Sequence, residues 1–68
     1  MHAILKTGRK DGHVSSWKLW WANGLLMSSV DVTWASAAEK DTEFAQFCEV
    51  VRVLRNAGIV IHGDLERH

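Results

Sequence analysis

The sequence predicts a small two-layer α+β domain: a three-stranded antiparallel meander, then one helix packed on one sheet face, then a short C-terminal strand. Three observations predict it. Asp-Gly and Asn-Gly pairs separate β-compatible runs, an apolar stripe of helical period follows, and a β-branched run comes last. Because 68 residues make a single domain, residues 1–68, with a small core, each large apolar side chain matters to the fold.

The hairpin around Asn23-Gly24 is the best-defined part of the meander. Asn-Gly favours a two-residue type I′ loop, because both loop positions need a positive φ. This loop pairs Trp20 with Met27. Side chains alternate between the two faces of a strand, so the register assigns each residue to a face. The face predicted to be buried holds Trp17, Leu19, Trp21, Leu26, Val30, Val32 and Trp34. The opposite face holds Ser16, Lys18, Trp20, Met27, Ser29 and Asp31.

Residues 2–7 form another β-compatible run, which a glycine-rich turn joins to the next strand. Used as a two-residue loop, the Asp-Gly pair of this turn places Ile4 and Lys6 on the core face. A longer loop places Ala3 and Leu5 there instead. The longer loop is favoured because it keeps the lysine out of the core, but the register stays open.

Residues 36–39, Ser-Ala-Ala-Glu, fit a capping box, and residues 41–42 offer a second helix start one turn later. Apolar residues then recur at helical spacing and mark the face that should cover the sheet. Gly58 supplies the left-handed residue that ends a helix. The apolar stripe consists of Phe44, Phe47, Cys48, Val51 and Leu54.

Residues 59–62 are mostly β-branched and predict a fourth strand. If this strand joins the sheet, the helix is a crossover. The strand should then lie parallel to the third strand, either at its side or beyond the first. The polar tail, residues 63–68, is expected to fray.

The charge of the chain is polarised although its sum is zero. Residues 1–23 carry four basic side chains against one acidic one, a net +3, and residues 24–68 carry four against seven, a net −3. A dipolar molecule can dock in a preferred orientation on a partner or on a second copy of itself. It lacks the general basic excess of a protein that binds duplex DNA.

The single cysteine, Cys48, cannot form an internal disulfide and is expected to be an inert core thiol, which favours a reducing compartment. No signal peptide and no apolar run long enough for a membrane span is seen, so we expect a cytoplasmic protein without membrane contact. No metal or cofactor is expected, because the four histidines lack the spacing of metal ligands. These histidines are His2, His13, His62 and His68.

Catalytic chemistry has little support in the sequence. His62 and Asp64 pair an imidazole with a carboxylate, but no nucleophile or second carboxylate is spaced to complete a site. We therefore predict that the protein is not an enzyme.

Trp20 is the tryptophan predicted to lie on the face that one helix cannot cover, and apolar patches on a polar surface tend to be contact sites. The sequence thus predicts a protein-binding domain of inhibitor or adaptor type, which could act as a homodimer whose exposed sheet face or last strand completes the interface. Small inhibitors from phages and other mobile elements, including those that block bacterial defence complexes, are of this size. The predicted contact residues are Trp20, Met27, Lys18, Leu25, Arg9 and Lys10.

A second hypothesis assigns the basic N-terminal hairpin to single-stranded nucleic acid. Trp20 would stack on a base, and Arg9, Lys10 and Lys18 would contact the backbone. One ring and a net charge of zero support this hypothesis less well than the first.

Overall fold

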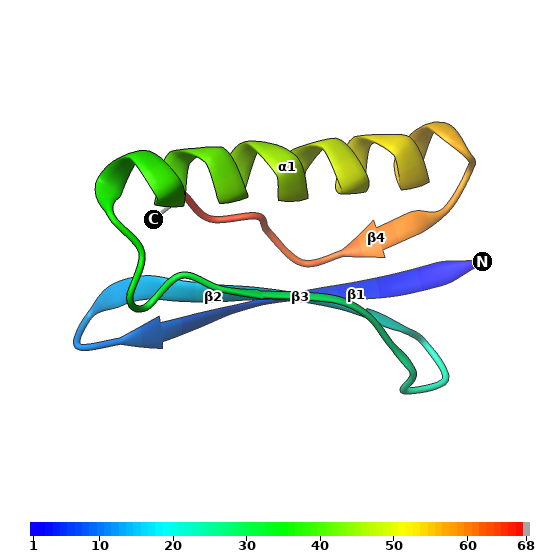
Figure 1. Cartoon of the computed structure of the whole chain (residues 1–68). Helices are drawn as coiled ribbons and strands as arrows, with labels where there is room; N and C mark the ends of the chain where they lie inside the picture. Colours follow the sequence, from blue (N-terminus) through cyan, green and yellow to red (C-terminus); the bar gives the residue numbers. More distant parts are fainter. Residues whose placement is uncertain (68) are drawn as a thin grey trace.

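In the computed structural model, which describes residues 1–67, four strands form one sheet and a helix lies across one of its faces (Figure 1). The elements are β1 (His2–Lys10), β2 (His13–Trp21), β3 (Leu26–Asp31), α1 (Ala37–Asn56) and β4 (Val60–His62). The strand order is β3-β2-β1-β4, with β4 parallel to β1 and the other pairs antiparallel. The predicted α+β fold is confirmed, and the last strand lies beyond the first.

The turn between β1 and β2 is a two-residue loop. Asp11 and Gly12 have φ values of 52° and 79°, as a type I′ turn requires. A register shift follows at once, because Gly8 pairs with Ser16 whereas Arg9 pairs with Val14. Ser15 therefore has no partner on β1 and forms a β-bulge. Beyond the bulge, the residues of β1 face the opposite way from what an unbroken two-residue hairpin would give, so Ala3 and Leu5 are buried. The predicted inward residues are therefore right, but the longer loop predicted for them is wrong.

The turn between β2 and β3 differs from the predicted type I′ loop. Gly24 has a φ of 92°, but Asn23 keeps a negative φ. The loop closes with hydrogen bonds from the Trp21 N–H to the Leu25 carbonyl (2.8 Å) and from the Gly24 N–H to the Trp21 carbonyl (2.9 Å). This is a three-residue loop with a left-handed glycine at its end. The Ala22 N–H also donates to the His2 carbonyl (3.2 Å), which extends the β1–β2 ladder into the loop.

A bulge at Met27 compensates for the extra loop residue. Trp20 pairs with Leu26 and Leu19 with Ser28, so Met27 has no partner on β2. The predicted pairing is right from Ser28 onward and wrong for the pair of Trp20 with Met27. A one-residue slip exchanges the two faces of a strand. Met27 therefore packs against the core, and Leu26, predicted to be buried, is 51% exposed.

The helix α1 begins at the first of the two predicted starts and ends where the sequence predicts. The Ser36 hydroxyl accepts the Glu39 N–H (3.2 Å) and the Glu39 carboxylate accepts the Ser36 N–H, a complete capping box. At the other end, the Gly58 N–H donates to the Arg55 carbonyl with a φ of 89° at the glycine. Of the two helix starts considered, the first is the one observed.

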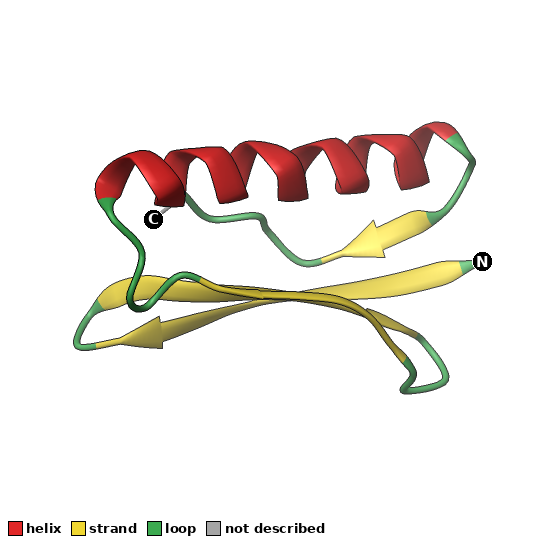
Figure 2. Ribbon diagram, viewed as in Figure 1, coloured by secondary structure: helices red, strands yellow, loops and turns green. Residues whose placement is uncertain are grey.

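The core lies between α1 and the sheet, as Figure 2 shows for the two layers. Trp17 is fully buried, and its ring centroid lies 5.3 Å from that of Phe44 and 6.3 Å from that of Phe47. Cys48 of the predicted stripe is half-buried. Trp34, predicted for the core, is 91% exposed. The fully or nearly buried residues are Ala3, Leu5, Val14, Trp17, Leu19, Val32, Phe47 and Val51.

The C-terminal tail runs between α1 and the sheet (Figure 1, red). Leu65 packs against the core, and the Trp17 indole N–H donates to the Glu66 carbonyl (2.7 Å). Arg9 forms an ion pair with the Glu66 carboxylate (2.7 Å). Leu65 and Glu66 thus lie against the covered face of the sheet, and the expectation that the tail frays stays a prediction. Residue 68 lies outside the described residues.

Candidate functional site

The face of the sheet opposite α1 carries the candidate site. Within residues 1–67, the helix and the tail both lie on the other face, which leaves this open face accessible (Figure 2). Ile4 on β1 is paired directly with Trp20 on β2, and Trp20 directly with Leu26 on β3. These three residues form what we call the apolar row. Ile4 is 38% exposed, Leu26 is 51% exposed and Trp20 is half-buried.

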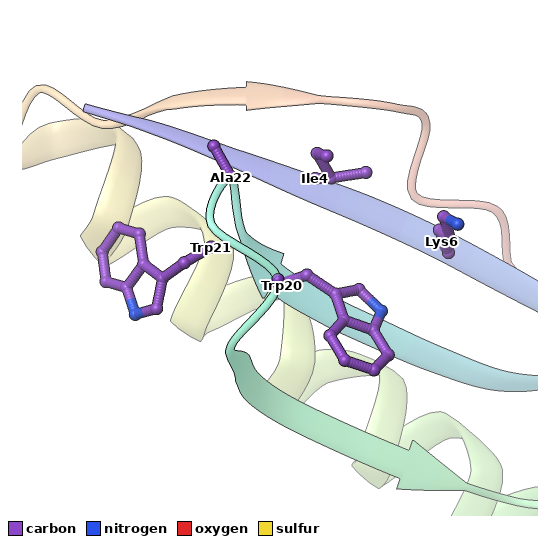
Figure 3. A pocket seen from close by; sticks show the side chains of 6 residues that line it. Ile4, Lys6, Trp20, Trp21 and Ala22 are labelled. Carbon is purple, nitrogen blue, oxygen red and sulfur yellow. The ribbon is translucent and has the colours of Figure 1, made fainter.

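A shallow hollow of about 300 Å³ lies beside the apolar row. Figure 3 shows Ile4 and Lys6 on β1 next to the Trp20 ring, while the Trp21 ring extends in the opposite direction. Trp21 instead packs against the core, which follows from the alternation of side chains along β2. The hollow is of the size of one or two side chains, so it suits a protruding residue of a partner better than a large ligand.

Next to the apolar row lies a basic pair. Lys6 on β1 is directly opposite Lys18 on β2, and both side chains are exposed. Like charges that face each other across two strands are unfavourable. The arrangement therefore reduces the stability of the free protein and concentrates positive charge beside the apolar row.

The far end of the open face is polar and includes Asp31, which pairs with Ser16. Hydrogen bonds from the side chain and the backbone of Thr33 lower the pKa of Asp31, with smaller contributions from Lys10 and Lys18. Asp31 thus stays ionised at neutral pH. Its carboxylate accepts the Thr33 N–H (2.8 Å) and so orders the loop that follows β3.

The structure brings together two of the six predicted contact residues. Trp20 and Lys18 lie next to each other on the open face, and Leu25 is 64% exposed at the tip of the hairpin. Met27 lies on the covered face, and Arg9 reaches the tail, where it is paired with Glu66.

Lys10, the remaining predicted residue, lies over the exposed ring of Trp34, with 5.1 Å between its Nζ and the ring centroid.

Sequence reasoning missed Leu26 because the bulge at Met27 reverses the way it faces. Ile4 and Lys6 face outward, as the favoured register predicts, but they were not included among the predicted contact residues. Neither bulge has a marker in the sequence, since Ser15 and Met27 are ordinary strand residues. The exposure of Trp34, by contrast, could have been predicted from the sequence.

The residues before Trp34 include Asp31 and Thr33, which are typical of a turn, and a turn carries its side chains away from the sheet.

The edge of the sheet holds a histidine pair. The Nδ1 of His2 on β1 lies 2.8 Å from the Nε2 of His62 on β4, and the rings are stacked with 5.1 Å between centroids. Among residues 1–67, no group of three or more His, Cys, Asp or Glu side chains could hold a metal ion. The same residues include no helix that is both long and apolar enough to cross a membrane.

Comparisons with protein-family models, with curated proteins and with solved structures found no match to this chain.

Proposed function

We propose that this protein is a non-enzymatic binding domain that holds a partner protein on its open sheet face. The observation that carries the proposal is the apolar row, in which Ile4, Trp20 and Leu26 lie in direct register across three strands. The proposed partner presents an apolar segment with acidic residues beside it.

The apolar row would supply most of the affinity. Exposed apolar surface gains about 25 cal/mol for each Å² that a partner covers. Tryptophan is one of the residues enriched at the energetic centre of such contacts, where less critical neighbours exclude water around it. Trp20 has this position, because Ile4 and Leu26 flank it on both sides.

The lysines would set the orientation and the choice of partner. Lys6 and Lys18 repel each other in the free protein, and carboxylates of a partner would relieve this repulsion. An acidic flank on the partner is therefore part of the proposal.

A domain of this kind acts by occupying its partner, as an inhibitor or an adaptor does. The inhibitor role, including that of a mobile-element inhibitor of a host complex, and the cytoplasmic location belong to the same proposal. They are supported by the small size of the chain and by a lone cysteine that has no internal partner for a disulfide.

The test is affinity capture with nuclease-treated lysate, followed by titration of the purified partner. We expect Trp20→Ala to weaken partner binding by about 30-fold or more, the loss typical of a hot-spot residue. Exchange of both lysines, Lys6→Glu with Lys18→Glu, should also weaken partner binding, because the acidic flank of the partner would then meet like charges. Trp34→Ala is the matched control, because it removes an exposed tryptophan outside the open face.

Two results would contradict the proposal. One is a partner that binds the wild type and Trp20→Ala equally. The other is a pure protein that light scattering shows to be a dimer and that becomes monomeric on Trp20→Ala. In that case a second copy of the chain covers the open face.

A further inference from the structure

The loop between β3 and α1 holds Trp34 in solvent although two hydrogen bonds fix the loop on either side of it. The Thr33 N–H donates to the Asp31 carboxylate (2.8 Å), and the Ala35 N–H donates to the Val32 carbonyl (3.1 Å). Thr33 and Trp34 are thus the two central residues of a closed turn. The indole is 91% exposed because the turn directs it outward, and exposed tryptophans on rigid elements are typical of binding surfaces.

Basic side chains from three elements gather around this indole. Lys10 is the last residue of β1, His13 is the first of β2, and Lys40 lies near the start of α1. All three line a hollow of about 310 Å³ together with Trp34. Asp11 is the acidic residue of the lining. The hollow therefore has a net positive charge, built from parts of the chain that only the fold brings together.

The Trp34 ring has one face occupied and one face free. The Nζ of Lys10 lies 5.1 Å from the ring centroid, a cation–π contact that steadies the indole from one side. With 91% of the residue exposed, the other face is open to a planar group. An aromatic face beside lysines is the combination that grips single-stranded nucleic acid, through base stacking and phosphate contacts.

An acidic peptide fits this surface less well. Its carboxylates would use the lysines and the histidine, but they would leave the flat face of Trp34 unpaired. A nucleotide uses both features, since its base stacks on the ring and its phosphate meets the cations.

We propose that the hollow beside Trp34 binds one nucleotide of a single-stranded nucleic acid, with the base on the open indole face and the phosphate between Lys10 and Lys40. This activity is separate from the binding of a partner protein. The two sites lie at opposite ends of β2, because Trp20 is near its last residue and His13 is its first. Substitutions can therefore affect one site without the other.

The test is fluorescence anisotropy at low salt with a labelled single-stranded oligonucleotide. A length of about ten nucleotides matches one small binding site. We expect Trp34→Ala to weaken binding about 5- to 100-fold, as loss of one stacked base does. Trp34→Phe should retain part of the affinity. Lys40→Gln should weaken binding and reduce the slope of log affinity against log salt by about 0.7, the value for one phosphate of a single strand.

The matched control is Trp20→Ala, which should bind the oligonucleotide as the wild type does. A circular dichroism spectrum of each variant shows whether it is folded. Saturable binding that depends on Trp34 and Lys40 supports the proposal. Absence of saturable binding at low salt, or equal binding by wild type and Trp34→Ala, overturns it. A peptide of ten glutamates that binds as tightly as the oligonucleotide overturns it too, because charge alone would then explain the site.

Discussion

Trp17 and Trp20 lie three residues apart on β2 and point to opposite faces of the sheet. Trp17 is fully buried, packs against two phenylalanines of α1, and donates its indole N–H to the tail. Trp20 is half-buried and lies between Ile4 and Leu26 on the neighbouring strands. The next cross-strand pair on the same face consists of Lys6 and Lys18. On the covered face, the ring of Trp17 is packed and its N–H is hydrogen-bonded within the protein. The difference teaches that the covered face is built for stability, whereas the open face keeps apolar surface and charge unused.

The largest expected effect comes from the covered face. Trp17→Ala should reduce the free energy of unfolding by about 3–5 kcal/mol, because it removes a buried aromatic side chain. It also leaves the Glu66 carbonyl without the indole donor. In a domain this small such a loss is a large part of the total stability. Urea unfolding followed by circular dichroism measures it.

Trp20→Ala is the control for this prediction, and its loss should be about 1 kcal/mol or less, in the range of surface substitutions. An equally large loss for Trp20→Ala would break the comparison, because the open face would then be needed for folding.

A smaller effect is expected where the tail joins the covered face. A methyl group added at Gly63 would lie 2.3 Å from the Leu5 carbonyl oxygen, and the φ of 109° suits glycine alone. Gly63→Ala should destabilise the protein by about 2 kcal/mol or more. In an NMR spectrum it should also shift the indole N–H signal of Trp17, since the Glu66 carbonyl would move away.

Gly58→Ala is the matched control for the tail. Gly58 also has a positive φ, 89°, but an added methyl group would meet no atom within 4 Å. The expected loss is about 1 kcal/mol, from the backbone conformation alone. Equal losses for the two variants would show that the close approach of the tail to β1 contributes nothing.

The smallest effect is expected on the open face, with the opposite sign. Lys6→Gln removes one of two like charges that face each other and should stabilise the protein by roughly 0.2–1 kcal/mol at low salt. High salt should remove most of the gain by screening. Thermal unfolding at two salt concentrations measures this.

Lys18→Gln should act in the same direction, and the double variant should gain less than the sum of the two single variants. Additive gains would mean that Lys6 and Lys18 do not repel each other, and that the open face carries no unrelieved charge.

The two hairpins show where sequence reasoning about the sheet was right and where it was not. Asn23-Gly24 has the stronger type I′ signal, yet the type I′ geometry occurs at Asp11-Gly12. In each hairpin a bulge then corrects the register, at Ser15 and at Met27, so that the middle of every strand faces as predicted. The errors of facing within the strands lie at Leu26 and Met27, at the start of β3 beside the second turn. Leu26 belongs to the apolar row, which is why the fold was predicted better than the site.

The sequence by itself determined the class of the fold, the order of its elements and the C-terminal end of α1, and it narrowed the start of α1 to two candidates. These features depend on local physics, namely the alternation of side chains, the capping box of Ser36 with Glu39, and the left-handed Gly58. The tertiary structure alone decided the position of β4, the packing of the tail against Trp17, and the grouping of Lys10, His13 and Lys40 around Trp34. Those features depend on contacts between residues far apart in the chain, and no local pattern records which distant partner completes a hydrogen bond or shares a hollow.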